Sequence, residues 1–151
     1  IQFKHRSRGE RQLADADSAA RELQCTARSG PQARLDTHEV LPVRPTPGRE
    51  INHRIVYTAC GLGNPPLAGT IVRRVSFRGK VLLEDSDRFT MRAGRWAVDA
   101  FIGIPPRAEP GPYRVEVRIE RRGVQLPASP TGWSGRVSCW RVRYPWIDAI
   151  S

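Results

Sequence analysis

The clearest pattern of apolar and polar residues lies in the segment 95–123, where two stretches alternate with a period of two. In residues 96–104, apolar side chains fall on one face and Asp99 falls on the other, and two prolines end the stretch. In residues 113–120, tyrosine, valine and isoleucine alternate with arginine and glutamate. Such alternation is typical of a strand with one buried and one solvated face. We therefore predict two β-strands that form the centre of the fold.

Shorter apolar patterns separated by turn residues extend this prediction to the rest of the chain. Residues 68–84 have the pattern of a hairpin that turns at Arg78–Gly79. The 13 glycines and 13 prolines in 151 residues fit many short strands better than helices. With turns about every 8–12 residues, the sequence predicts an all-β sandwich or barrel of about seven to nine strands. Further strands are predicted over residues 35–43, 50–60, 89–91, 124–126 and 136–147.

The N-terminal part of the chain has a different composition. Residues 10–27 are rich in helix formers, and acidic residues stand early in this stretch, where the helix dipole favours them. We predict a short amphipathic helix here, and two units: an N-terminal helical arm over 1–34 and a sandwich over 35–151. The apolar face of the helix is thin, so Leu13 and Leu23 are expected to contact the sandwich or a partner.

Aromatic residues are concentrated at the C-terminal end. They form either a buried lid or a patch that faces a partner. The candidates for partner contact in this region are Trp133, Trp140, Tyr144 and Trp146.

The chain has three cysteines, and none of them stands in a CxxC pair or at a zinc-site spacing. We predict one disulfide, with Cys60 and Cys139 as its candidates and a bridge from Cys25 to either of them as the alternative. A disulfide indicates a periplasmic or extracellular protein, whereas three reduced thiols would indicate a cytosolic one. Because the chain begins at Ile1, a removed signal peptide or a missing N-terminal membrane anchor is a further expectation.

The net charge of +10 raises the question of nucleic-acid binding. Of the 25 basic residues only Lys4 and Lys80 are lysines, a skew that codon usage in a GC-rich genome produces. The arginines are spread along the chain, which favours a solvated basic surface over a polyanion site. The alternative, a polyanion-binding surface, would use Arg6, Arg8, Arg11, Arg73, Arg74, Arg121, Arg122, Arg141 and Arg143.

Candidate chemistry is sparse. His38 and His53 would be neighbours if their strands pair, and with Asp36 they could in principle bind zinc or iron, but a structural role is favoured. The acidic run 84–87 could hold calcium, although an exposed turn is the favoured interpretation. No hydrolase or phosphate-binding motif is present. We therefore predict no enzyme activity, no metal and no cofactor.

The segment that leads into the strand 113–120 resembles a known structural corner. Residues 36–126 resemble bacterial immunoglobulin-like domains, in which a Pro-Gly turn leads into a tyrosine at the start of strand F. The sequence departs from antibody-type domains in two ways, because this strand lacks a cysteine and the tryptophan lies just before the corner. The matching positions are Ala108, Pro110, Gly111, Tyr113, Val115 and Val117.

The resemblance implies an immunoglobulin-like antiparallel sandwich that serves as a structural, adhesive or carbohydrate-facing part of an exported protein. The function we predict is an exported, non-catalytic structural, assembly or adhesion subunit that acts through protein–protein contacts. One alternative is a basic accessory protein of a nucleic-acid or other polyanion-binding assembly. The other is a carbohydrate-binding module that stacks sugars on Trp133, Trp140 or Trp146.

Overall fold

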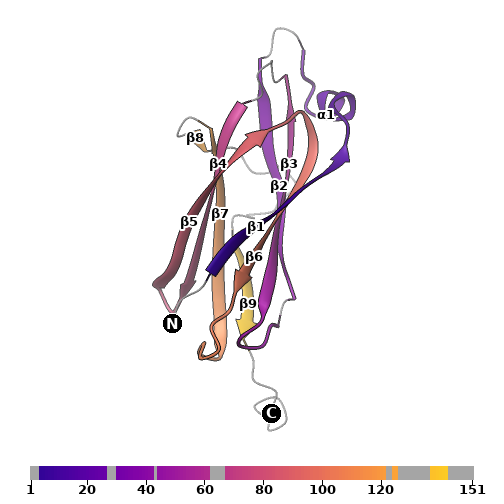
Figure 1. Ribbon diagram of the computed structural model, residues 1–151. Coiled ribbons are helices and arrows are strands. Elements are labelled where there is room, and N and C mark those ends of the chain that lie inside the picture. The colour runs from indigo at the N-terminus through magenta and orange to yellow at the C-terminus, as the bar shows by residue number, and fades with distance from the viewer. Residues whose placement is uncertain are drawn as a thin grey trace.

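The computed structural model describes residues 4–26, 30–42, 44–61, 67–121, 124–125 and 137–142, with side chains over 9–26, 30–42, 44–61 and 68–120. These residues form two antiparallel sheets packed face to face, with one short helix at one end (Figure 1), which confirms the predicted all-β sandwich. Sheet A has the order β1-β6-β3-β2, and sheet B has the order β5-β4-β7, with β8 and β9 both paired to β7. The elements are β1 (Lys4–Ala14), α1 (Ala16–Glu22), β2 (Gln32–Leu41), β3 (Glu50–Cys60), β4 (Leu67–Phe77), β5 (Lys80–Met91), β6 (Gly94–Gly103), β7 (Gly111–Arg121), β8 (Val124–Gln125) and β9 (Val137–Val142).

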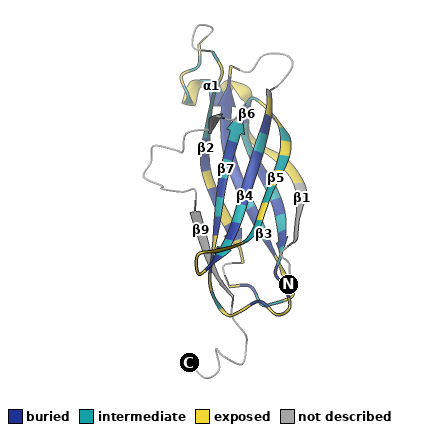
Figure 2. Ribbon diagram, turned by 90° about the vertical axis from the view of Figure 1, so that its left-hand side faces the viewer, coloured by how far each residue is buried: buried dark blue, intermediate teal, exposed yellow. Residues whose placement is uncertain are grey.

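The alternating residues of β3, β6 and β7 point into the space between the sheets, as their period predicted. On β7 the residues Tyr113, Val115, Val117 and Ile119 are all buried, whereas Arg114 between them is exposed. Figure 2 shows the buried positions along the strands of both sheets. The core divides into two apolar clusters, one around Ile51, Val75, Ile102, Tyr113 and Val115, the other around Leu35, Ile55, Tyr57, Ile71 and Ile119.

Strand β3 is buried on both faces near its C-terminal end. Val56, Thr58 and Cys60 alternate with the core residues and therefore face away from sheet B, yet their exposure is 8%, 0% and 1%. Helix α1 packs against β3 and β6 at this end and buries Ala19 completely. The helix thus covers the outer face of sheet A where that face is apolar.

The predicted helix over residues 10–27 is corrected by the structure. Lys4–Ala14 form strand β1, which pairs antiparallel with β6 from Lys4–Gly103 to Ala14–Arg95, and the helix is confined to Ala16–Glu22. Asp15 sets the start of the helix, since its carboxylate accepts a hydrogen bond of 2.7 Å from the Ser18 amide. The first strand was missed because its stability comes from hydrogen bonds to a segment about 90 residues away, which local periodicity does not reveal.

The hairpin β4–β5 turns where the sequence predicted it, at Arg78 and Gly79, whose φ angles of 52° and 79° match a tight two-residue turn. Strand β5, however, continues to Met91, so the acidic run 84–87 lies within a strand and is not an exposed turn. The physical reason is the backbone pairing of β5 with β4, which runs from Phe77–Lys80 to Leu67–Met91. Glu84 lies opposite Arg74, and its carboxylate bonds that guanidinium at 3.1 Å.

Candidate functional site

A tyrosine corner marks the passage from sheet A to sheet B. The Tyr113 hydroxyl donates a hydrogen bond of 2.7 Å to the carbonyl oxygen of Glu109, four residues upstream. The Tyr113 ring stacks on Phe77 of β4, with ring centroids 4.5 Å apart. Gly111 has a φ of +136°, and a Cβ there would lie 3.1 Å from the Phe77 ring, so this position favours glycine. The corner is therefore fixed by local sequence and by packing together.

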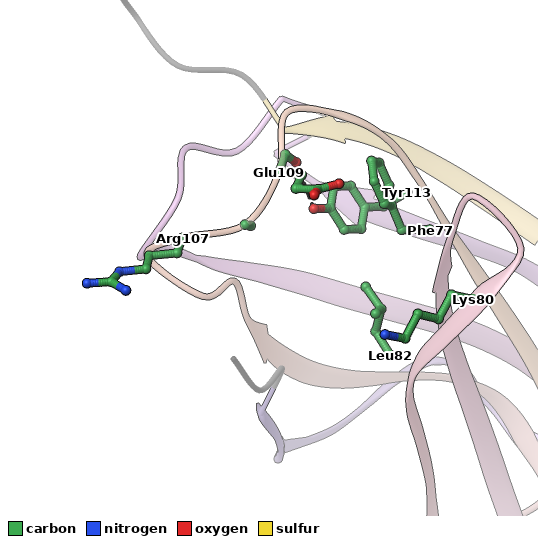
Figure 3. Close-up of a pocket in the computed structure, with 7 residues that line it drawn as sticks. Phe77, Lys80, Leu82, Arg107, Glu109 and Tyr113 are labelled. Atoms are coloured by element: carbon green, nitrogen blue, oxygen red, sulfur yellow. Dashed lines mark hydrogen bonds between the residues drawn. The ribbon is translucent and has the colours of Figure 1, made fainter.

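Beside this corner lies a pocket with a volume of about 390 Å³ (Figure 3). The stacked rings of Phe77 and Tyr113 lie on one side of the pocket, and Leu82 and Lys80 of β5 lie on the opposite side. Leu82 is the extra residue of a β-bulge between the pairs Val75–Leu83 and Ser76–Val81. Such bulges turn a side chain toward a site that regular alternation would not reach. The complete lining is Phe77, Lys80, Leu82, Arg107, Ala108, Glu109 and Tyr113.

Charged side chains of both signs border this pocket, with Lys80 and Glu109 among its lining residues. The Arg78 guanidinium lies 4.8 Å from the centre of the Phe77 ring, a cation–π contact. It also lies 3.9 Å from the Glu109 carboxylate, but both side chains are largely exposed, so this ion pair is weak. Lys80 lines the pocket, whereas the Arg107 side chain points away from it (Figure 3). The pocket can therefore accept an apolar group that stands next to a carboxylate.

A second polar feature, a buried hydrogen-bonded chain, crosses the interior of the sandwich. His38 of β2 and His53 of β3 meet with ring nitrogens Nδ1 and Nε2 3.0 Å apart. Arg73 of β4 donates from Nε to His53 Nδ1 at 2.9 Å and from a terminal nitrogen to Asp87 of β5 at 3.1 Å. Exposure is 6% for His38, 0% for His53 and 1% for Arg73. Burial lowers the pKa of Arg73, which Asp87 and Asp85 oppose.

Asp36, the third member of the predicted histidine cluster, has other partners. Its carboxylate accepts hydrogen bonds from Arg34 Nε at 2.6 Å and from the Thr58 hydroxyl at 2.5 Å. The register shifts between Leu35 and Thr37, so Asp36 sits in a bulge. The structure thus brings His38 and His53 together as predicted, but Asp36 belongs to a separate ion-pair cluster. Among the described residues no group of three or more acidic, histidine or cysteine side chains could hold a metal ion.

The disulfide joins Cys60 to Cys25, with Cα atoms 6.3 Å apart. This is the alternative bridge, and it replaces the predicted pairing of Cys60 with Cys139. Cys139 lies on β9 opposite Arg114 of β7, in sheet B, whereas Cys60 ends β3 in sheet A. Cys25 follows helix α1, which packs on β3. The sequence could not choose between these pairings, because the choice depends on where the helix docks.

The structure describes only some of the residues that were predicted to contact a partner. Leu13 on β1 is 43% exposed, and Leu23, at the C-cap of α1, is half-buried. Trp140 lies on β9 in register with Tyr113, but its side chain is outside the described part. Trp133, Tyr144 and Trp146 lie outside the described residues. These positions therefore stay predictions.

Several arginines on the outer face of sheet B are paired with carboxylates. Arg74 contacts Glu84 at 3.1 Å and Glu116 at 3.8 Å, and Arg118 contacts Glu120 at 2.5 Å. Arg73, one of the predicted polyanion contacts, is buried in the interior. Within the part of the chain that the structure describes, no helix is long and apolar enough to cross a membrane.

Sequence reasoning missed three of these residues. Arg73 falls between Ile71 and Val75 on one face of the strand pattern, and that position was the available signal that it could be buried. Phe77 and Leu82 were assigned to strands but not to a pocket. No local signal identifies them, because the pocket needs the corner at 107–113 to fold over the hairpin.

No model of a known protein family and no curated protein matches the sequence. Among solved structures, the chain is similar to a Pseudomonas fluorescens alkylpurine DNA glycosylase bound to abasic-site DNA, at 14% identity over 85% of this chain and 37% of that one, with a TM-score of 0.47. It is also similar to a CARDB domain from Pyrococcus furiosus, at 11% identity over 75% and 87% of the two chains, with a TM-score of 0.46. The reeler domain of human F-spondin matches at 13% identity over 74% and 89%, with a TM-score of 0.38.

The chain spans little more than a third of the glycosylase chain that it matches. With TM-scores of 0.47, 0.46 and 0.38, these similarities carry no conclusion about what this chain does.

Proposed function

We propose that this chain is an exported, non-catalytic immunoglobulin-like domain that binds a segment of a partner protein at the corner pocket. The single observation that carries the proposal is the pocket between the Phe77–Tyr113 stack and the Leu82–Lys80 wall. It offers an apolar surface next to positive charge, the combination by which protein interfaces anchor one side chain and orient its neighbours.

The strand pairing supports the immunoglobulin-like assignment. Strand β3 pairs with β6 in one sheet, and β4 pairs with β7 in the other, as strands B–E and C–F do in immunoglobulin-like sandwiches. In this correspondence β7 is strand F, and Tyr113 near its start forms the tyrosine corner. The chain lacks the conserved disulfide between the two sheets, and Cys25–Cys60 ties a helix to one sheet instead.

The occupant that fits this pocket is a segment with an aliphatic or aromatic side chain beside an aspartate or glutamate. The apolar side chain would lie between the Phe77 ring and Leu82, and the carboxylate would meet the Lys80 ammonium. Strand β5 stands at the end of the strand order of sheet B, so an extended segment could lie along it.

Two further observations support the compartment and the absence of catalysis in this proposal. The Cys25–Cys60 disulfide fits an oxidising compartment, such as the periplasm or the extracellular space. Of the groups that could act as bases, His38 and His53 are engaged with each other and with Arg73 inside the sandwich, and Asp36 is engaged with Arg34 and Thr58. None of the three lines the pocket.

The proposal is tested by selecting peptides from a random phage-displayed library on the folded, oxidised protein and measuring their affinity by fluorescence anisotropy. We expect the selected peptides to share an apolar residue next to an acidic one. The Lys80→Glu variant should weaken their binding about 5- to 10-fold or more, because it places like charges opposite each other. Lys80→Arg should retain binding.

The matched control is Arg88→Glu, which makes the same charge change on the same strand at an exposed position outside the pocket. Equal losses in both variants would show an effect of net charge and would contradict a pocket-specific contact. Selection of no peptide, together with tryptophan fluorescence changes on a glycan panel, would move the carbohydrate-binding alternative to first place.

A further inference from the structure

The buried chain His38–His53–Arg73–Asp87 links the two sheets. The histidines come from β2 and β3 of sheet A, and the arginine and aspartate come from β4 and β5 of sheet B. Each link is within hydrogen-bond distance, at 3.0, 2.9 and 3.1 Å in order along the chain. The contact between His53 and Arg73 is the one that crosses from one sheet to the other. These four hydrogen-bonded residues are therefore part of the interface that holds the two sheets together.

The hydrogen bonds fix the protonation state of both imidazoles. A guanidinium only donates, so His53 Nδ1, which faces Arg73 Nε, must be unprotonated. The single proton of a neutral His53 is then on Nε2, from where it points to His38 Nδ1. His38 Nδ1 must in turn accept, so its proton is on Nε2. Both rings are neutral, and each has one defined tautomer.

We propose that the hydrogen-bonded series His38–His53–Arg73–Asp87 is an acid-sensitive contact between the two sheets. It holds the sandwich closed while both histidines are neutral and weakens when one of them is protonated. A proton added to His53 Nδ1 would face the Arg73 Nε–H group, and a proton added to His38 Nδ1 would face the His53 Nε2–H group. Either event replaces a hydrogen bond by two opposed donors in a buried site.

The charges around the pair reinforce this effect. Arg73 already carries a positive charge beside His53 at 1% exposure, and a second buried positive charge would repel it. From β5, Asp87 is paired with Arg73 at 3.1 Å, and Asp85 acts on the same guanidinium from further away. From β6, the residue paired with His53 is Ala100, which is neutral. On β2 and β3, the carboxylate of Asp36 is held by Arg34 and Thr58.

The sign of the pH dependence follows from proton counting. In the unfolded chain an imidazole takes up a proton near pH 6.5, whereas the closed sandwich excludes it. The unfolded state therefore binds more protons below this pH, and the stability of the fold is present above about pH 6.5 and is lost as the pH falls. One excluded proton raises the unfolding equilibrium constant about 10-fold per pH unit, or about 30-fold between pH 6.5 and 5.

The experiment measures denaturant unfolding of the oxidised protein between about pH 7 and 5, above the range where most carboxylates titrate. We expect the wild-type unfolding constant to rise by about 30-fold for one excluded proton and by up to about 1,000-fold for two. His53→Gln keeps an acceptor and a donor without a titratable ring, and His38→Gln keeps the acceptor. With two excluded protons, each variant should remove about half of the rise in the logarithm of the unfolding constant; with one, a single variant should remove all of it. His5→Gln, which removes the third imidazole of the chain, should leave the slope unchanged.

A nitrogen-15 NMR assignment of the wild-type imidazole tautomers gives a readout that does not depend on whether a variant folds. We expect a proton on Nε2 of both His38 and His53 at about pH 7. A proton on Nδ1 of His53 would overturn the proposal. A flat wild-type stability between pH 7 and 5 would also overturn it, and so would a slope that persists in both glutamine variants or is lost in His5→Gln.

Discussion

Two buried tyrosines place their hydroxyl groups differently. Tyr113 donates to a carbonyl of the corner at 2.7 Å, so its hydroxyl fixes the path of the backbone. Tyr57 on β3 packs its ring edge-on to Phe89 of β5, and its hydroxyl accepts a hydrogen bond of 3.2 Å from the Arg92 amide. Burial raises the pKa of Tyr57 to about 12. At the scale of the residue, the stability of the fold at alkaline pH therefore depends on Tyr57 staying protonated.

We expect the fold to lose stability between about pH 10 and 12 because the unfolded chain ionises Tyr57 while the folded chain keeps its proton. Over this window of about two pH units the linkage amounts to roughly 2–3 kcal/mol. Tyr57→Phe should lower the free energy of unfolding only slightly near neutral pH, since the Arg92 amide can donate to water instead. Between about pH 10 and 12 the variant should then lose less of its free energy of unfolding than the wild type does. Denaturant unfolding of both proteins across this range measures the difference. Parallel pH profiles would show that Tyr57 is not responsible.

Helix α1 and the end of β3 act together at the scale of the element. The helix has only seven residues and would not be stable alone. Three contacts hold it: Ala19 packs at 0% exposure, Glu22 binds Arg34 of β2 at 2.6 Å, and the Cys25–Cys60 disulfide ties its C-terminal side to the end of β3. The helix in turn buries the outer face of sheet A.

Removing the disulfide should destabilise the protein without changing its sheets. The bridge connects residues 35 positions apart, and closing a loop of this length stabilises a fold by about 2–4 kcal/mol. The double variant Cys25→Ser, Cys60→Ser should show this loss in denaturant unfolding, whereas Cys139→Ser should change stability little. Peptide mapping of the non-reduced protein should recover the Cys25–Cys60 link. A mapped Cys60–Cys139 link would contradict the structure.

At the scale of the whole molecule, 25 basic and 15 acidic residues give the net charge of +10, and several of these carboxylates lie next to arginines. On the outer face of sheet B, arginines of β4 and β7 alternate with glutamates of β5 and β7, and each ion pair keeps a guanidinium close to a carboxylate. Each such exposed pair contributes little to stability. Their larger effect is on the surface potential, because paired arginines present less net charge to a polyanion.

We therefore expect weak binding to duplex DNA or RNA at low salt that disappears at about 0.15 M salt. The triple variant Glu84→Gln, Glu116→Gln, Glu120→Gln frees arginines on sheet B and should bind more tightly, with a salt dependence steeper by roughly one unit for each arginine that newly meets a phosphate. Electrophoretic mobility shifts over a salt series measure both. Tight binding by the wild type at physiological salt would favour the nucleoprotein alternative.

The sequence by itself determined the strands whose apolar residues alternate, because a half-buried strand needs one apolar face wherever it packs. Strand β3 falls on Glu50–Cys60 as predicted, β7 buries Tyr113 to Ile119, and the turn at Arg78–Gly79 follows from local backbone preferences. The tyrosine at the start of β7 was also identified from its neighbours along the chain.

Only the tertiary structure decided which segments meet. Strand β1 is a strand because β6 offers it hydrogen bonds, and Cys25 reaches Cys60 because α1 docks on β3. Arg73, which by its type belongs on the surface, is buried because His53 of β3 and Asp87 of β5 bind it from two other strands, and His38 of β2 in turn binds His53. These contacts join residues far apart in sequence. Their free energy depends on distance and burial in three dimensions, which a one-dimensional pattern does not contain.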